Sequence, residues 1–124
     1  SHGVHGYIAS NTAADRAGLQ TPDDELKAMG DGGISGPPLA ERATCLVRYL
    51  YRVTDGDTPI IGVGGVRGAD TAYAKIRAGA SLVQLYTALV YEGPGLIRRI
   101  KEGLVQRLRD DGHVSVTDAV GTAV

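Results

Sequence analysis

Phenylalanine and tryptophan are absent from this sequence, and cysteine occurs once, as Cys45. A single cysteine excludes an internal disulfide framework and is typical of a reducing compartment. No uncharged apolar stretch approaches the roughly 20 residues that a membrane-spanning helix needs. The first residues show no basic start followed by an apolar run, so we expect no signal peptide. We interpret Ser1-His2 as a tag remnant, outside the folded unit of residues 3–124.

Neither sign of charge is in excess, because 13 Lys and Arg residues balance 14 Asp and Glu residues. A formal net charge of -1 gives no electrostatic case for binding nucleic acid or anionic lipid. The histidines are scattered, and no His, Cys, Asp or Glu cluster has metal-ligand spacing, so we expect no metal. Cys45 falls inside a predicted helix with no base in view, which favours a small packing residue over a nucleophile.

Glycine is what the sequence has in abundance, with 18 residues. That is about twice average usage, and it indicates tight turns or close approaches of the backbone to a ligand. The glycines alternate with strongly aliphatic segments, which argues against disorder. The chain therefore reads as one globular domain with an unusual number of sharp turns.

Aliphatic runs at residues 4–10, 59–65 and 81–86 predict three buried strands. Helical patterns at 37–53, 70–78 and 96–110 follow them, with a last helical turn near 116–121 and a long loop at 15–36. Continuous rather than alternating apolar runs indicate parallel strands covered on both faces. The order β, loop, α, β, α, β, α predicts an α/β fold with βαβ crossovers. Periodicity leaves open whether this is a doubly wound sheet or part of a (β/α) barrel.

The helical patterns also predict which side chains are buried. The expected core residues are Leu39, Ala43, Leu46, Leu50 and Val53 in the first helix, Ala72, Tyr73 and Ile76 in the second, and Ile100, Leu104 and Leu108 in the third.

A glycine turn and a threonine follow two successive strands. Gly64 and Gly65 end the second strand, and Tyr86-Thr87 ends the third. Backbone N–H groups at glycines can approach an anion closely, and the loops after the last two strands of a barrel often bind phosphate. The pair therefore predicts a phosphate site. The alternative is that the glycines serve only to make a tight turn.

Two weaker signals lie nearer the start of the chain. Asn11 and Thr12 follow the first strand, where barrel ligands bind, and can hydrogen-bond a planar polar ring. The alternative is a simple loop start. The loop at 32–36, which ends in Gly36, is either a backbone cradle over a cofactor or a flexible connector.

Together these segments resemble the class 2, quinone-dependent dihydroorotate dehydrogenases. The most specific stretch is 76–89, which contains Leu85-Tyr86-Thr87 at the end of the last strand. The supporting segments are 10–12, 32–36, 60–66 and 116–121. The resemblance implies the last three or so βα units of a (β/α) TIM barrel. One departure is Ala13, where the family usually has a second Thr.

The resemblance also implies roles for individual residues. Gly64, Gly65, Tyr86 and Thr87 would bind the FMN phosphate. Gly36 and Ser10 would lie along the flavin. Asn11 and Thr12 would hydrogen-bond dihydroorotate or orotate.

The family reaction is oxidation of dihydroorotate to orotate in pyrimidine biosynthesis, with FMN as cofactor and a quinone as final acceptor. The whole enzyme would associate with a bacterial or mitochondrial inner membrane, and this fragment would be soluble. The catalytic base, the other substrate residues and the membrane segment would lie upstream, so no catalytic residue is expected here. We therefore expect the isolated chain to be inactive, and to need the rest of the barrel or to self-associate.

Alternative functions remain at this stage. The chain could be another FMN-dependent or sugar-phosphate barrel enzyme, although these would not share Asn11-Thr12 together with the Leu-Tyr-Thr strand end. It could also be a non-catalytic half-barrel or a flavin- or phosphate-binding fragment. A small doubly wound domain is a further alternative, and the long loop at 15–36 argues against it.

Overall fold

Strands and helices alternate along the chain in the computed structural model, which describes residues 3–124. Ser1 and His2, interpreted above as a tag remnant, lie outside the described residues. The elements are β1 (Tyr7–Ala9), α1 (Asp23–Ala28), the 3-10 turn η1 (Pro37–Leu39), α2 (Ala40–Val53), β2 (Ile60–Val63), α3 (Ala69–Arg77), β3 (Leu82–Gln84), α4 (Thr87–Glu92), α5 (Gly95–Asp110) and α6 (Val116–Ala119).

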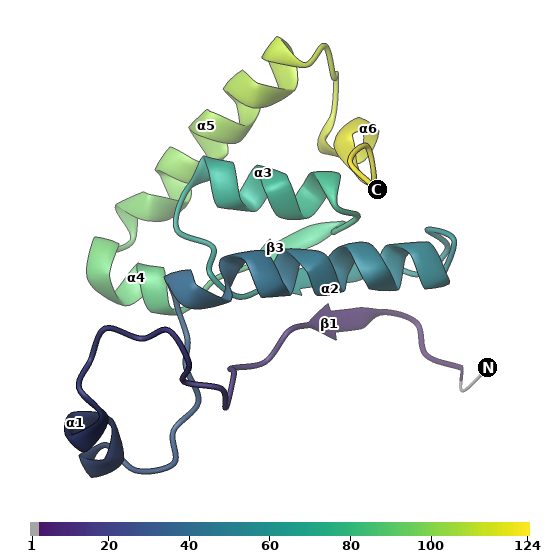
Figure 1. Cartoon of the computed structure of the whole chain (residues 1–124). Helices are drawn as coiled ribbons and strands as arrows, with labels where there is room; N and C mark the ends of the chain where they lie inside the picture. The colour runs from purple at the N-terminus through teal and green to yellow at the C-terminus, as the bar shows by residue number, and fades with distance from the viewer. Residues whose placement is uncertain (1–2) are drawn as a thin grey trace.

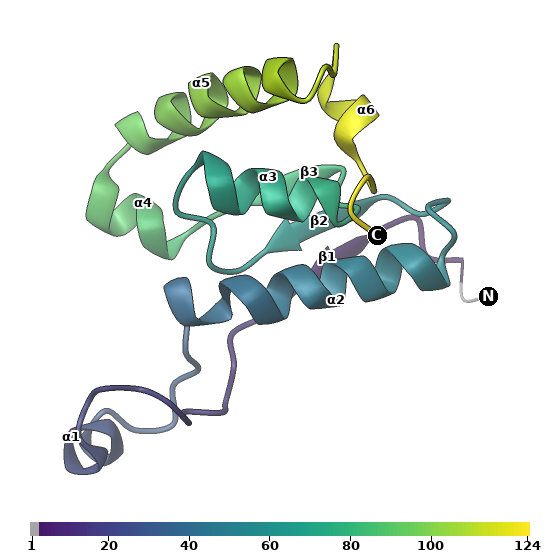
Figure 2. The same ribbon diagram turned by 45° about the horizontal axis from the view of Figure 1, so that its top comes forward.

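The three strands form one parallel sheet in the order β1-β2-β3. Helices α2 and α3 lie side by side against one face of this sheet, and α5 packs on the outer side of α3 (Figures 1 and 2). Each pair of neighbouring strands is therefore joined by a crossover helix, as in a barrel. The predicted α/β architecture is confirmed.

The core lies between the sheet and its helices. One cluster joins Val47 of α2 to Ile60 of β2 and to Ala78 and Ala80, which lie between α3 and β3. Two further clusters join α3 to α5 and α6, through the side chains of Ala72, Leu96, Ile100, Tyr73, Ile76, Leu108 and Ala119. The predicted burial of the second helix is thus confirmed, and the third buries Ile100 and Leu108, with Leu104 partly buried.

The buried stripe of α2 differs from the predicted one. Leu39, Ala43 and Val47 are buried, whereas Leu46 is 38% exposed and Val53 is 59% exposed. The buried residues are spaced four apart, which is one of the rows that side chains form on a helix surface. It is this row, 39–43–47, that faces β2. Leu46 is one position off this row and points away from the core.

Several further elements differ from expectation. β1 and β3 are shorter than predicted, and neither is a buried strand, because both lie at edges of the sheet and one face of the sheet is uncovered. The loop at 15–36 contains the two-turn helix α1, and α4 was not predicted. Cys45 is exposed and is not a packing residue.

The tail of the chain closes the end of the sheet at which the strands begin. The N–H of Gly121 donates to the Ile76 carbonyl at 3.2 Å, and the N–H of Ala123 donates to the Arg77 carbonyl at 2.9 Å. Arg48 of α2 in turn donates from its Nε to the Ala123 carbonyl at 3.1 Å. The tail, residues 121–124, therefore connects α2 to α3. It lies far from α1 and α4 (Figure 1).

The second face of the sheet carries an exposed apolar row. Ile8, Ile61 and Leu82 are in register across the three parallel strands, so their side chains share one face. Ile8 is 69% exposed and Leu82 is 62% exposed, because no helix within residues 3–124 covers that face. An open apolar sheet with two free edges invites association.

We therefore expect the chain to self-associate through this row, as measured by light scattering. The double variant Ile8→Lys, Leu82→Lys should shift the chain towards monomer, because charges on both edge strands oppose pairing. Met29→Lys, Val114→Lys adds the same charge at exposed sites outside the row and should leave the association unchanged. A monomeric parent chain would contradict the expectation.

Candidate functional site

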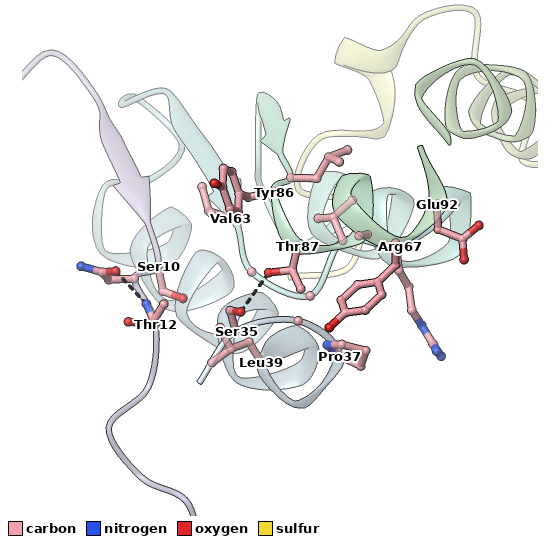
Figure 3. A pocket seen from close by; sticks show the side chains of 18 residues that line it. Ser10, Thr12, Ser35, Pro37, Leu39, Val63, Arg67, Tyr86, Thr87 and Glu92 are labelled. Atoms are coloured by element: carbon pink, nitrogen blue, oxygen red, sulfur yellow. Dashed lines mark hydrogen bonds between the residues drawn. The ribbon is translucent and has the colours of Figure 1, made fainter. Parts of the chain in front are cut away.

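A pocket of about 670 Å³ opens where the strands end and the next segments begin. Figure 3 shows its lining side chains converging from the ends of β1, β2 and β3 and from the loop before α2. All eight residues proposed from sequence as ligand contacts line it: Ser10, Asn11, Thr12, Gly36, Gly64, Gly65, Tyr86 and Thr87. Residues as far apart in the sequence as Ser10 and Glu92 therefore meet in one cavity.

The glycine turn after β2 forms one wall of the pocket. Gly64 and Gly65 have φ values of 108° and 69°, in the left-handed region that side chains disfavour. A Cβ on Gly65 would lie 2.5 Å from the backbone N and Cα of Ala40, and one on Gly64 would lie 3.1 Å from the Ala43 Cβ. The turn thus packs directly on the first turns of α2.

Thr87 connects the end of the β3 segment to the glycine loop before α2. Its hydroxyl donates to the Ser35 hydroxyl at 2.9 Å (Figure 3). Gly36 has a φ of 82°, and a Cβ there would approach the Thr87 Cγ2 to 3.3 Å. The loop at 32–36 is therefore held against Thr87 and lines the pocket, which argues against a flexible connector.

Asn11 and Thr12 lie at the rim of the pocket, and both are exposed. The Asn11 Oδ1 accepts a hydrogen bond from the N–H of Thr12 at 2.8 Å, which leaves the amide nitrogen of Asn11 free to meet a ligand. A short antiparallel bridge pairs Ala13 with Ile34, so the loop at 32–36 also runs beside Thr12. No space remains for a side chain on Gly33, because Thr12 lies where its Cβ would be.

Sequence reasoning missed four polar residues of this pocket: Ser35, Arg67, Tyr91 and Glu92. Ser35 precedes Gly36, and Arg67 closely follows the glycine turn, so adjacency to the motifs was a usable signal. Tyr91 is four residues after Thr87 and was missed because α4 was not predicted. Tyr86 and Tyr91 are 80% and 84% exposed, so the pocket is open on this side.

Ser10, Asn11 and Thr12 also line a second hollow, of about 500 Å³, on the side of α2. Arg42, Cys45 and Leu46 form its other wall. This hollow explains why Leu46 and Cys45 are exposed, since both lie where α2 passes the end of β1.

Among residues 3–124, no three His, Cys, Asp or Glu side chains gather in a way that could hold a metal ion. The helices of that same range are also too short or too polar to cross a bilayer.

Comparison with known proteins identifies the family. The sequence profile of the family described as dihydroorotate dehydrogenase matches residues 1–108. The chain is 56% identical over 119 residues to dihydroorotate dehydrogenase (quinone) of Roseiflexus castenholzii, covering 96% of this chain and 31% of the relative. It is 52% identical over 122 residues to the protein of the same name from Parvibaculum lavamentivorans, and the match covers 98% of this chain and 34% of that relative.

Solved structures agree. The ligand-free dihydroorotate dehydrogenase of Eimeria tenella superposes with a TM-score of 0.87 at 38% identity, covering 97% of this chain and 32% of that one. This chain thus spans about a third of the length of the relatives that it matches. Three parallel βα units, a match over most of the sequence and close relatives of one kind place the chain in the dihydroorotate dehydrogenase family, in its class 2, quinone-dependent branch.

Proposed function

We propose that this chain supplies the FMN phosphate site and part of the substrate site of a quinone-dependent dihydroorotate dehydrogenase, as the C-terminal part of its barrel. The observation that carries the proposal is the single pocket that brings together the glycine turn, Thr87, Gly36 and the Asn11-Thr12 pair. In barrels, such a pocket at the carboxyl ends of the strands is where ligands bind. On this proposal the folded unit is residues 3–124.

The residues present fit FMN. A cavity of about 670 Å³ is within the range of roughly 300–1,000 Å³ that small-molecule sites occupy. Gly64 and Gly65 would present backbone N–H groups to the phosphate. Thr87 would turn its hydroxyl hydrogen from Ser35 to the phosphate and donate it there. Tyr86 would flank the phosphate, and Gly36 leaves room for the ring to lie close to the backbone.

The substrate end of the site would lie at the rim formed by β1. Asn11 would use its free amide N–H and Thr12 its hydroxyl to orient dihydroorotate, with Ser10 between them and the flavin. FMN, when bound, would supply the redox chemistry, taking electrons from dihydroorotate and passing them to a quinone. The chain's own residues would bind and orient the two molecules, and the membrane association of the whole enzyme would come from elsewhere.

A titration of the chain with FMN, followed by flavin fluorescence, tests the cofactor site. We expect saturable binding that weakens about 10-fold or more in Thr87→Val, since a hydrogen bond to a charged group contributes about 1.5–3 kcal/mol. Ser35→Ala is the matched control, because it removes only the neutral partner of Thr87. Its effect should be smaller than that of Thr87→Val. Equal affinities for all three proteins would count against the phosphate role.

The same titration separates the proposed function from its alternatives. If orotate added to the FMN-loaded chain changes the flavin fluorescence, and Asn11→Ala abolishes that change, the substrate role is supported. FMN binding without any response to orotate would favour a flavin-binding fragment or another FMN-dependent barrel enzyme. If FMN does not bind, repeating the titration with the upstream part of a relative supplied in trans would show whether the missing strands are needed.

A further inference from the structure

Lys75 of α3 is the largest fully buried side chain among residues 3–124, with 0% of its surface exposed. Lysine is rarely buried unless an acid pairs with it. Here the ammonium donates to two neutral oxygens of α2, the Ala40 carbonyl at 3.2 Å and the Thr44 hydroxyl at 3.0 Å. A methionine of similar length would fill this space without burying a charge, so the charge itself calls for an explanation.

The contacts of Lys75 lead to the glycine turn of the pocket. Its Cδ and Cβ lie 3.2 Å and 3.4 Å from where a Cβ on Gly62 would be, so its stem runs along β2 just before the turn. Its ammonium reaches Ala40, the residue against whose backbone Gly65 packs. Thr44 reinforces this point, because its hydroxyl also donates to the Ala40 carbonyl, at 2.8 Å.

We infer that Lys75 is a positioning residue for the phosphate end of the cofactor site, which fixes the first turn of α2 against Gly64-Gly65 and places a buried positive charge behind them. This inference rests on the proposed function. A charge enclosed by protein is screened less than one in solvent, so it acts on a phosphate at the turn without touching it. The two charged side chains that line the pocket itself, Arg67 and Glu92, are opposite in sign.

The protonation of Lys75 gives this inference a pH signature. Burial lowers the pKa of Lys75 to about 8. The groups seen against it are the Ala40 carbonyl and the Thr44 hydroxyl of α2 and the backbone of Gly62 in β2, and none of these three ionises. A bound phosphate dianion favours the charged form and therefore raises this pKa. FMN affinity should then be full below about pH 8 and fall as the pH rises above it.

The test compares FMN with riboflavin, which has the same ring and no phosphate. Dissociation constants are measured at pH 7 and pH 9.5 for the parent chain, Lys75→Met and Lys101→Met; Lys101 is an exposed lysine of α5. We expect Lys75→Met to bind FMN about 10-fold more weakly at pH 7, to bind riboflavin as before, and to lose the decline at pH 9.5. Lys101→Met should behave like the parent.

The outcomes separate this inference from the proposed function. If the parent binds FMN no better than riboflavin, the phosphate site is absent and both proposals fail. If the parent prefers FMN and Lys75→Met keeps that preference, or weakens both flavins equally, Lys75 is only a packing residue. Should Lys75→Met not fold, NMR titration of the Lys75 ammonium in the parent decides: its pKa should rise with FMN but not with riboflavin, and an unchanged pKa overturns the inference.

Discussion

Gly65→Ala is expected to abolish FMN binding and to lower the melting temperature of the chain by about 10 °C. Gly65 has a φ of 69°, and an added Cβ would lie 2.5 Å from the backbone N and Cα of Ala40. Backbone atoms inside a helix cannot turn aside as the end of a side chain can, so either α2 or the turn must move. A left-handed alanine with such an overlap costs about 3 kcal/mol, and each kcal/mol shifts the melting temperature of a domain of this size by several degrees.

Gly68→Ala is the matched control for this substitution, because it lies in the same connection between β2 and α3. Gly68 has an extended backbone with a φ of -176°, and a Cβ there would meet nothing within 4 Å. Since Gly68 is the N-cap of α3, alanine should cost no more than about 1 kcal/mol. Thermal unfolding by circular dichroism and the FMN titration measure both variants. If Gly65→Ala keeps the parent's affinity, the turn does not hold the phosphate.

The chain alone, supplied with FMN, dihydroorotate and a quinone or a dye, is expected to show no turnover above the buffer rate. The proposal gives it the phosphate end and one rim of the substrate site, but no general base, and a positioned base contributes about 10²–10⁴-fold to a rate. The pocket is also open to solvent beside Tyr86 and Tyr91, so water weakens any electrostatic stabilisation within it.

Dye reduction followed by absorbance is the measurement, and a full-length quinone-dependent relative in the same assay shows that the assay detects activity. The chain should remain inactive at any concentration at which FMN saturates it. Turnover by the pure chain that Asn11→Ala abolishes would contradict the proposed division of the site.

The sequence predicted the architecture well because the strands are nearly continuous aliphatic runs separated by glycine turns. It predicted the pocket well for a related reason: Gly64-Gly65, Tyr86-Thr87 and Asn11-Thr12 all follow strands, and parallel strands present those ends on one side. The burial of α2 was harder, because an apolar face wide enough to include Leu46 and Val53 does not reveal which row meets the sheet. Lys75 gave no signal at all, since a lysine in an amphipathic helix normally faces solvent.

The family resemblance added the identity of the expected ligands, FMN and dihydroorotate. Glycine turns and hydroxyl groups indicate an anion, but they do not distinguish a flavin phosphate from a sugar phosphate. Only the combination with Asn11-Thr12 and the Leu-Tyr-Thr strand end indicated this family, and the relatives at 56% and 52% identity support it.

The tail that joins α2 to α3 lies at the end of the sheet opposite the pocket. Gly121 packs there on the ring of Tyr51: a Cβ added to Gly121 would lie 2.5 Å from the Tyr51 Cζ. The residues proposed to bind ligands and the residues that hold the tail are thus segregated at the two ends of the strands, as catalysis and stability are in complete barrels. An engineer could therefore strengthen the tail region, for example around Arg48 and Ala123, and tune ligand preference at the other end as nearly independent variables.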